Sequence, residues 1–241
     1  MLSVKNVKKS FNGGKTFAVD NISFDVHSSE IFGFLGPNGA GKTTMIKMIT
    51  GLLQLDSGSI EINGVDIEKD SIEAKRQFSF VPDSPEVFDK LKGIEYLNFL
   101  GDVYGVESKD RIERIEKYAT LFGLKNALND PIMSYSHGMK QKIVLIGALL
   151  HEPEIFVLDE PMVGLDPKSA YNLKEIMNEH CQKGKSVFFS THVLEVAEKI
   201  CNRVAIINKG KIIAQGTIEE LKNMTKNNES LENIFLELTE E

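Results

Sequence analysis

The sequence predicts an α/β fold with a mainly parallel sheet, an antiparallel β portion near the N-terminus and an inserted α-helical subdomain. Short apolar stretches typical of buried strands alternate with stretches of helical spacing along most of the chain. Two helical stretches follow each other without a strand between them. The dipeptides Asn63-Gly64 and Lys209-Gly210 are typical of hairpin turns, which join antiparallel strands.

The first part of the chain supplies strands and one helix. Residues 19–26 alternate apolar and polar side chains, which predicts a half-buried strand, and residues 31–35 form a short buried one. Residues 43–53 carry apolar side chains at helical spacing and run into turn residues at 56–58. A strand at residues 59–62 ends at the Asn63-Gly64 turn.

In the middle of the chain, helical spacing continues without an intervening strand. Residues 93–106 and 109–124 both place apolar side chains three and four positions apart, which predicts two consecutive helices. We expect a helical subdomain over about residues 84–150, inserted into a catalytic core made of residues 1–83 and 151–216.

Alternation resumes after this insertion. Strands are predicted at residues 155–158, 186–190, 204–207 and 212–214, and helices at 169–181 and 194–201. Residues 217–241 form a C-terminal helical extension, in which the polar stretch 224–229 is expected to link to a last helix.

Composition excludes several classes of protein. The net charge of -7 argues against a general nucleic-acid binder. No signal peptide is recognised, and no apolar run approaches the roughly 20 residues that span a bilayer. Cys181 and Cys201 lack metal-type spacing and are expected to be reduced thiols. We therefore expect a soluble cytosolic chain that reaches a membrane only through a partner.

The strongest chemical signal is "GPNGAGKTT", which lies between the strand at 31–35 and the helix at 43–53 and fits the phosphate-loop pattern. Its backbone N–H groups converge on phosphate oxygens, aided by the positive end of the helix dipole. Lys42 is expected to reach the β- and γ-phosphates, and the Thr43 hydroxyl to bind Mg²⁺. The alternative is a glycine-rich turn without function, which the flanking strand and helix disfavour. The predicted loop residues are Gly36, Pro37, Asn38, Gly39, Ala40, Gly41, Lys42, Thr43 and Thr44.

A second signal is "IFVLDEP", which places two carboxylates at the carboxyl end of a buried strand. Asp159 is suited to the magnesium shell, and Glu160 to orienting and deprotonating an attacking water. Alone, such a strand end would be an ordinary solvated one; the phosphate loop favours the functional interpretation.

Together these motifs resemble the ATP-binding subunit of an ABC transporter, over residues 1–216. The order also matches: phosphate loop, helical insertion, signature, acidic strand, Asp loop and a lone histidine. The resemblance implies ATP and Mg²⁺ as cofactors, a second ATP-binding subunit, identical or different, and a separate transmembrane permease. It also implies a place on the cytoplasmic face of the membrane, with no role for nucleic acid.

The resemblance assigns further residues one by one. Phe11 matches the aromatic residue that stacks on adenine; the alternative is a core phenylalanine. Residues 163–166, "VGLD", match the loop that crosses between two subunits, with Asp166 as its acidic member. His192, within "FFSTHVLEVAE", matches the histidine that contacts the γ-phosphate.

One departure from the family pattern is Asp83, where the family usually has glutamine after the strand that ends near Val81. A carboxylate still suits the magnesium side, but it donates no hydrogen bond toward the permease. Asp83 could equally be a turn residue between Pro82 and Pro85.

The other departure is the signature, "YSHGM" in place of the family's Leu-Ser-Gly-Gly-Gln. Ser136 is predicted to cap the next helix and to face the ATP of the opposite subunit, and Gly138 to let backbone approach phosphate. Met139 shares an apolar face with residues 143, 146 and 150, so we expect it to pack inward. His137 is expected to be a tolerated surface residue.

The function predicted is ATP-driven closure of a two-subunit sandwich, hydrolysis assisted by Glu160, and reopening that drives a transporter. The tail "SLENIFLELT" resembles drug and antimicrobial-peptide exporter ATPases; a plain amphipathic terminal helix is the alternative. An uptake-system ATPase, a soluble ABC-type ATPase and a regulatory module that binds nucleotide without hydrolysis stay open at this point.

Overall fold

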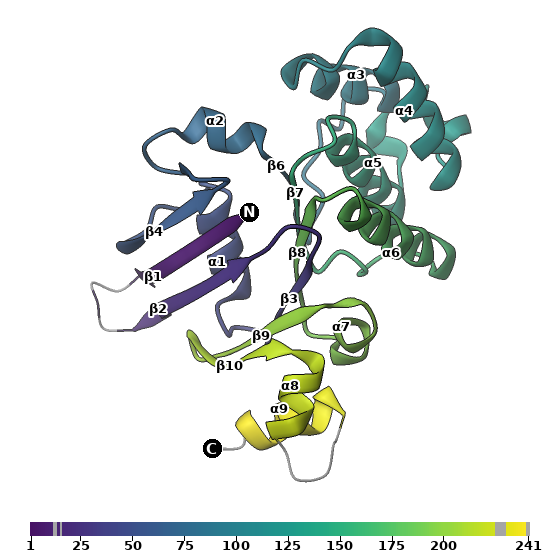
Figure 1. Ribbon diagram of the computed structural model, residues 1–241. Helices are drawn as coiled ribbons and strands as arrows, with labels where there is room; N and C mark the ends of the chain where they lie inside the picture. The colour runs from purple at the N-terminus through teal and green to yellow at the C-terminus, as the bar shows by residue number, and fades with distance from the viewer. Residues whose placement is uncertain (12–13, 15, 225–229, 240–241) are drawn as a thin grey trace.

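The computed structural model describes residues 1–11, 14, 16–224 and 230–239 (Figure 1). Most of the predicted linker, residues 225–229, lies outside the described residues. Among the described residues, two sheets form the body of the molecule. The helices α3, α4 and α5 gather at one end of it, and the C-terminal helices lie at the other (Figure 1).

The larger sheet carries the predicted parallel core. Within the described residues its strand order is β10-β9-β3-β8-β7-β6. All neighbours are parallel except β9 and β10, which form the antiparallel hairpin predicted at Lys209-Gly210. Strands β3, β7 and β8 are buried at every position, as expected for a sheet covered on both faces. The bounds are β3 Ile31–Leu35, β6 Phe78–Val81, β7 Ile155–Asp159, β8 Ser186–Thr191, β9 Arg203–Asn208 and β10 Lys211–Thr217.

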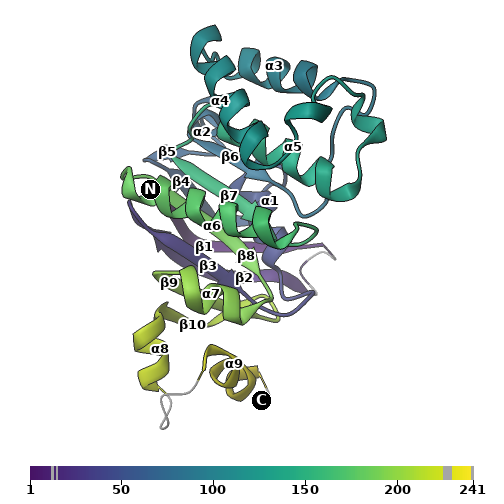
Figure 2. The same cartoon turned by 90° about the vertical axis from the view of Figure 1, so that its right-hand side faces the viewer.

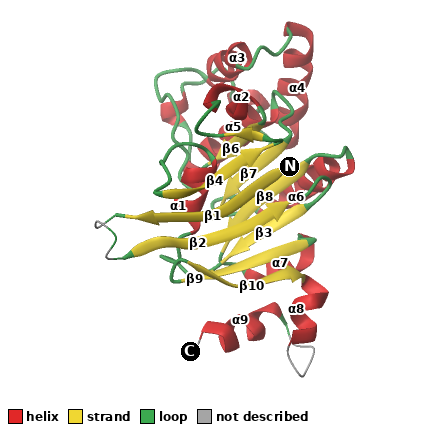
Figure 3. Ribbon diagram, turned by 60° about the vertical axis from the view of Figure 1, so that its left-hand side comes forward, coloured by secondary structure: helices red, strands yellow, loops and turns green. Residues whose placement is uncertain are grey.

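The smaller sheet is antiparallel throughout, which confirms the expected β portion near the N-terminus. Its order is β2-β1-β4-β5 in the part of the chain that the structure describes. Strands β2, β1 and β4 lie side by side in Figure 3. Phe24 stacks between the sheets, 5.4 Å from the Phe32 ring and 5.6 Å from the Phe188 ring. The helix α1, Lys42–Ile49, contributes Met45 and Ile46 to the same core. The strand bounds are β1 Leu2–Ser10, β2 Phe17–Val26, β4 Ser57–Ile62 and β5 Val65–Asp66.

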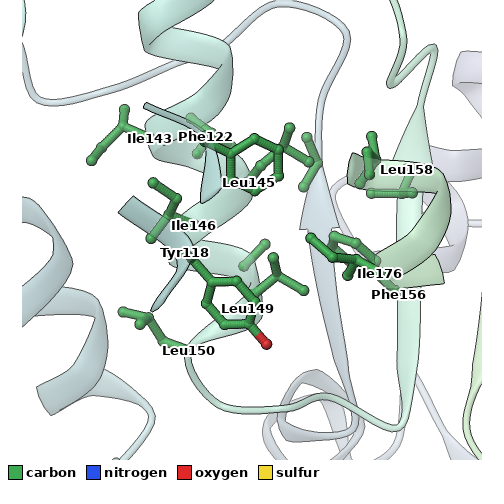
Figure 4. Close-up of a cluster of buried hydrophobic side chains, with 14 of the residues drawn as sticks. Tyr118, Phe122, Ile143, Leu145, Ile146, Leu149, Leu150, Phe156, Leu158 and Ile176 are labelled. Carbon is green, nitrogen blue, oxygen red and sulfur yellow. The ribbon is translucent and has the colours of Figure 1, made fainter. Parts of the chain in front are cut away.

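Helices follow the predicted order. The consecutive helices of the middle segment are α3 Gly93–Val103, α4 Ser108–Leu121 and α5 His137–Leu149, with short 3₁₀ turns at Lys125–Ala127 and Ile132–Ser134. Buried side chains of α4 and α5 pack against β7 and α6 and fix these helices to the sheet (Figure 4). The helices α6 Pro167–Gln182 and α7 Leu194–Ile200 cover one face of the large sheet (Figure 2). The C-terminal helices are α8 Ile218–Met224 and α9 Leu231–Thr239.

Some boundaries differ from the sequence prediction. The first helix ends at Ile49 instead of residue 53, because Gly51 takes the left-handed conformation (φ 66°) that terminates helices. Strand β1, strand β5 and the short helix α2, Ser71–Arg76, were not assigned from the sequence. Among the described residues, every helix is too short or too polar to cross a lipid bilayer.

Candidate active site

The phosphate loop, residues 36–44, connects the carboxyl end of β3 to the first turn of α1. Gly41 precedes the helix with φ 113°, a conformation that side chains rarely adopt. A Cβ atom there would also collide with the backbone carbonyl of Ala18. Glycine is therefore required for the loop to close onto β2 and to direct the N-terminus of α1 toward the site.

Lys42 lies at the bottom of this loop and is only 6% exposed. Its ammonium group donates to the carbonyl oxygens of Gly36 at 2.8 Å and Pro37 at 3.3 Å. It also lies 3.5 Å from Oε1 of Glu160. Carbonyl groups of the phosphate loop thus fix the position of the Lys42 ammonium group, at the edge of the large sheet where β3 and β7 end.

Asp159 ends strand β7 and is buried, with 2% of its surface exposed. The Ser190 hydroxyl donates a hydrogen bond to it from the neighbouring strand β8. Burial raises the pKa of Asp159, and the Asp83 and Glu160 carboxylates raise it further, whereas hydrogen bonds from Ser190 and Thr43 lower it. A nearby cation would favour the charged form of this carboxylate.

The oxygen atoms around Asp159 suit Mg²⁺. The Thr43 hydroxyl and the Asp83 carboxylate are hard oxygen donors of the kind that this ion prefers. Over the described residues, no group of three or more His, Cys, Asp and Glu is placed to hold a metal alone. Mg²⁺ usually takes one or two carboxylates together with phosphate oxygens and water.

Glu160 follows Asp159 in a left-handed backbone conformation, φ 47°, which is uncommon for a residue other than glycine. Its amide donates to the Ser190 carbonyl at 3.2 Å, which anchors the strained turn to β8. Nδ1 of His192 lies 3.0 Å from Oε1 of Glu160, and the His192 amide lies 3.4 Å from Oε2. Strain of this kind is concentrated at functional sites.

Predicted residues from distant segments line one pocket of about 220 Å³. Its lining consists of Ala18, Asn38, Gly39, Gly41, Lys42, Thr43, Thr44, Asp83 and Glu160. The structure therefore places Asp83 beside the phosphate loop.

Phe11 is 62% exposed, so the alternative of a core phenylalanine is wrong. Its ring lies 6.0 Å from the ammonium group of Lys9, and it is not among the described residues that line the pocket.

The signature segment, residues 135–139, lies at the start of α5 and outside this pocket. Ser136 caps the helix as predicted, accepting a hydrogen bond from the Met139 amide at 3.3 Å. His137 is exposed, and Met139 packs against the core of the helical segment, as expected from the sequence. Gly138 lies so close to the Gly164 carbonyl that a Cβ atom would be 2.9 Å from that oxygen.

The Asp loop, residues 163–166, packs against the signature segment. Asp166 caps α6, accepting from the Ser169 amide at 3.0 Å and from the Ser169 hydroxyl at 2.7 Å. The Lys142 ammonium, in the second turn of α5, lies 2.6 Å from Oδ2 of Asp166, the oxygen that also accepts from the Ser169 hydroxyl. The Lys142 and Ser169 hydrogen bonds hold the pKa of Asp166 well below its usual range.

Comparison with known proteins decides the family. The family model described as "ABC transporter" matches residues 19–163, which is more than half of the chain. The chain belongs to the ABC transporter family. Within it, the chain is an ATP-binding subunit, an ATPase cassette built around residues 36–44.

Similar proteins span most of the chain. The linearmycin resistance ATP-binding protein LnrL of Bacillus subtilis (strain 168) is 38% identical over 92% of this chain and 70% of its own length. The ABC-type transporter ATP-binding protein EcsA of the same organism is 35% identical over 100% of this chain and 97% of its own. A solved ATP-binding subunit of an ABC transporter superposes with a TM-score of 0.95, 32% identity and 99% coverage of both chains.

Sequence reasoning missed two side chains of this ABC ATPase. Ser190 holds Asp159 and anchors Glu160; it lies only two residues before His192, so its position in "FFSTH" was a usable signal. Lys142 pairs with Asp166 across 24 residues of sequence. No local sequence pattern predicts the Lys142–Asp166 pair, because it forms only when α5 and the Asp loop pack together.

Proposed function

We propose that this chain is the ATP-hydrolysing subunit of an exporter and powers a separate transmembrane permease. The observation that carries the proposal is the meeting of three groups beside the phosphate loop. The Lys42 ammonium and the His192 imidazole lie 3.5 Å and 3.0 Å from the same carboxylate oxygen of Glu160. A cation that neutralises phosphate charge and a carboxylate that accepts a proton from water serve phosphoryl transfer to water, and an imidazole beside them is suited to contact the phosphate.

Each residue has a distinct role in the proposed hydrolysis. Glu160 orients a water and accepts its proton, while Lys42 and the N-terminus of α1 neutralise charge that develops on the γ-phosphate. His192 donates a hydrogen bond to that phosphate. Mg²⁺, held by Thr43, Asp159 and Asp83, would supply charge neutralisation and orient the phosphate oxygens.

Two chains are needed in this mechanism. Ser136 and Gly138 present a capped helix N-terminus at the surface and do not line the phosphate-loop pocket among its described residues. Such a terminus is suited to binding the phosphates of an ATP held by another chain. Closure of two chains would then complete two sites, with Asp166 and Phe11 also serving nucleotide binding, and reopening after hydrolysis would deliver the mechanical output.

An exposed aromatic surface that begins a few residues after Asp83 suits the permease. Phe88 is 57% exposed and lies edge-on to Phe99, 5.7 Å between ring centroids, and Val103 extends the apolar surface along α3. Phe88 comes five positions after Asp83, which lies in the pocket wall. Movement at Asp83 would therefore be transmitted to this surface. Docking of a cytoplasmic part of the permease here would attach the chain peripherally to the membrane.

Export is supported by two observations. The relative LnrL is named for resistance to linearmycin, and the stretch "SLENIFLELT", which includes the last helix, resembles the ending of exporter ATPases. Purification of the chain with its native membrane partner tests the direction. A permease alone is expected; recovery of a periplasmic or lipoprotein solute binder would identify an uptake system instead.

Hydrolysis is tested by Glu160→Gln in a steady-state ATPase assay. Loss of the general base is expected to lower turnover about 100-fold or more while ATP binding persists. Glu195→Gln, which removes an exposed carboxylate three residues after His192, is the matched control and should turn over ATP like the wild type. Equal, negligible turnover in wild type and Glu160→Gln would contradict the proposal.

A further inference from the structure

The C-terminal helix α9 is built into the core beside the active site. Leu231 and Ile234 are 0% and 1% exposed, and they pack with Leu35, Ala197 and Ile206. Leu35 is the last residue of β3, directly before the phosphate loop, and Ala197 lies on α7, which follows His192. The helix thus packs against both elements that lead into the γ-phosphate side of the site.

Polar contacts fix the position of α9 on α7. The Leu231 amide lies 3.4 Å from Oε2 of Glu198, and the Lys222 ammonium of α8 lies 2.5 Å from Oε1 of the same side chain. Glu198 therefore joins all three helices. This contact fixes the first residue of α9 against α7.

One helical turn after Leu231, Phe235 lies beside the start of the phosphate loop. It lines a mainly apolar cavity of about 260 Å³ together with Gly36, Pro37, Asn38, His192 and Leu194. Phe235 lies outside all of the nucleotide-binding motifs. Phe235 therefore shares this cavity with both the phosphate loop and the switch segment, residues 192–194.

The switch segment needs such support. His192 has 48% of its side chain exposed, and Val193 caps the short helix α7 without a side-chain hydrogen bond. A helix start that lacks a cap is weakly held. An aromatic ring packed beside it restricts the positions that the imidazole adopts relative to the phosphate loop.

We propose that Phe235 is a positioning residue for ATP hydrolysis, which holds the switch segment against the phosphate loop so that His192 meets the γ-phosphate. This inference rests on the proposed function of His192. It gives the C-terminal extension a role in the chemical step, in addition to covering apolar surface.

The test compares Phe235→Ala with Leu236→Ala, a neighbouring apolar residue of the same helix that is 47% exposed. In Phe235→Ala, kcat is expected to fall roughly 5- to 10-fold with KM for ATP nearly unchanged, because positioning is lost and nucleotide contacts remain. Leu236→Ala should retain the wild-type kcat. In a His192→Ala background, single-turnover rates should show no further loss from Phe235→Ala, since the residue acts through the histidine.

Hydrogen exchange provides a readout that does not depend on activity. Phe235→Ala should raise amide exchange at residues 192–197 while β3 and β8 stay protected. Equal kcat and equal exchange in the Phe235→Ala and Leu236→Ala variants would overturn the proposal, as would an additive loss in the His192→Ala background. If Phe235→Ala unfolds, Phe235→Leu takes its place with the same expected pattern at smaller amplitude. An inactive wild type with increased exchange in the variant would reject the proposed hydrolysis and leave the packing role of Phe235 established.

Discussion

The phosphate-loop region and the signature region differ in how far their functional side chains are exposed. Around the loop, Lys42 and Asp159 are 6% and 2% exposed and are held by neighbouring backbone and by Ser190. Around the signature, Ser136 and His137 are exposed at the start of α5, and the contacts that fix them are to the helix and to the Asp loop. One region is enclosed within a single chain, and the other is displayed on its surface.

The carboxylates of the two regions show the same contrast. Burial raises the pKa of Asp159, whereas the Lys142 hydrogen bond lowers the pKa of Asp166. The first region is arranged for a bound cation and phosphate; the second is already neutralised by its own chain. The contrast fits the proposed mechanism, in which one chain binds ATP and a second chain completes the site.

The largest effect is expected from Lys42→Ala. Removing a buried ammonium group from the phosphate loop should weaken ATP binding by the single chain about 100-fold. Titration calorimetry with ATP and magnesium measures this. Lys47→Ala, on the exposed side of α1, is the control and should bind ATP like the wild type. Unchanged affinity in Lys42→Ala would remove the distinction between the two regions.

The enclosed region was the easier one to predict. The loop, its lysine and the acidic strand end are contiguous in sequence, so their spacing alone defines the chemistry. The buried parallel strands were found for a similar reason, because strands covered on both faces are short apolar runs. Strand β1 was not assigned; several lysines lie along it and register shifts interrupt its pairing with β2.

The displayed region depends on packing that sequence does not reveal. The Lys142–Asp166 pair and the close approach of Gly138 to Gly164 form only when α5 meets the loop before α6. The same holds for Phe235, which is far from the phosphate loop in sequence and lines a cavity with it only in the folded chain. Predicting these contacts requires the tertiary structure.

Ser136→Arg should disrupt the signature region and leave ATP binding at the phosphate loop unchanged. A long charged side chain at the helix N-terminus is expected to abolish ATP-dependent association of two chains and to lower turnover about 100-fold. Light scattering in a Glu160→Gln background measures the association. ATP affinity of the single chain should stay within about twofold of wild type. A loss of affinity as large as that of Lys42→Ala would show that Ser136 belongs to the same site within one chain.

The smallest effect is expected from His137→Gly. The imidazole is exposed and rests against Gly164, so its removal should leave more than about half of the ATPase activity. The glycine weakens the first turn of α5 by roughly 1 kcal/mol, which lowers the melting temperature by about 2–4 °C. Loss of all activity, with the melting temperature still in this range, would assign His137 a direct role in the reaction.

The central claim is that a complete site takes its phosphate loop from one chain and its signature from another. Mixing equal amounts of the Lys42→Ala and Ser136→Arg variants tests this most directly, because in a mixed pair one site receives both defects and the other receives none. With random pairing, half of the pairs are mixed and each has one intact site of two, so turnover should recover to about a quarter of the wild-type value. Turnover in the mixture no higher than that of the separate variants would contradict the claim.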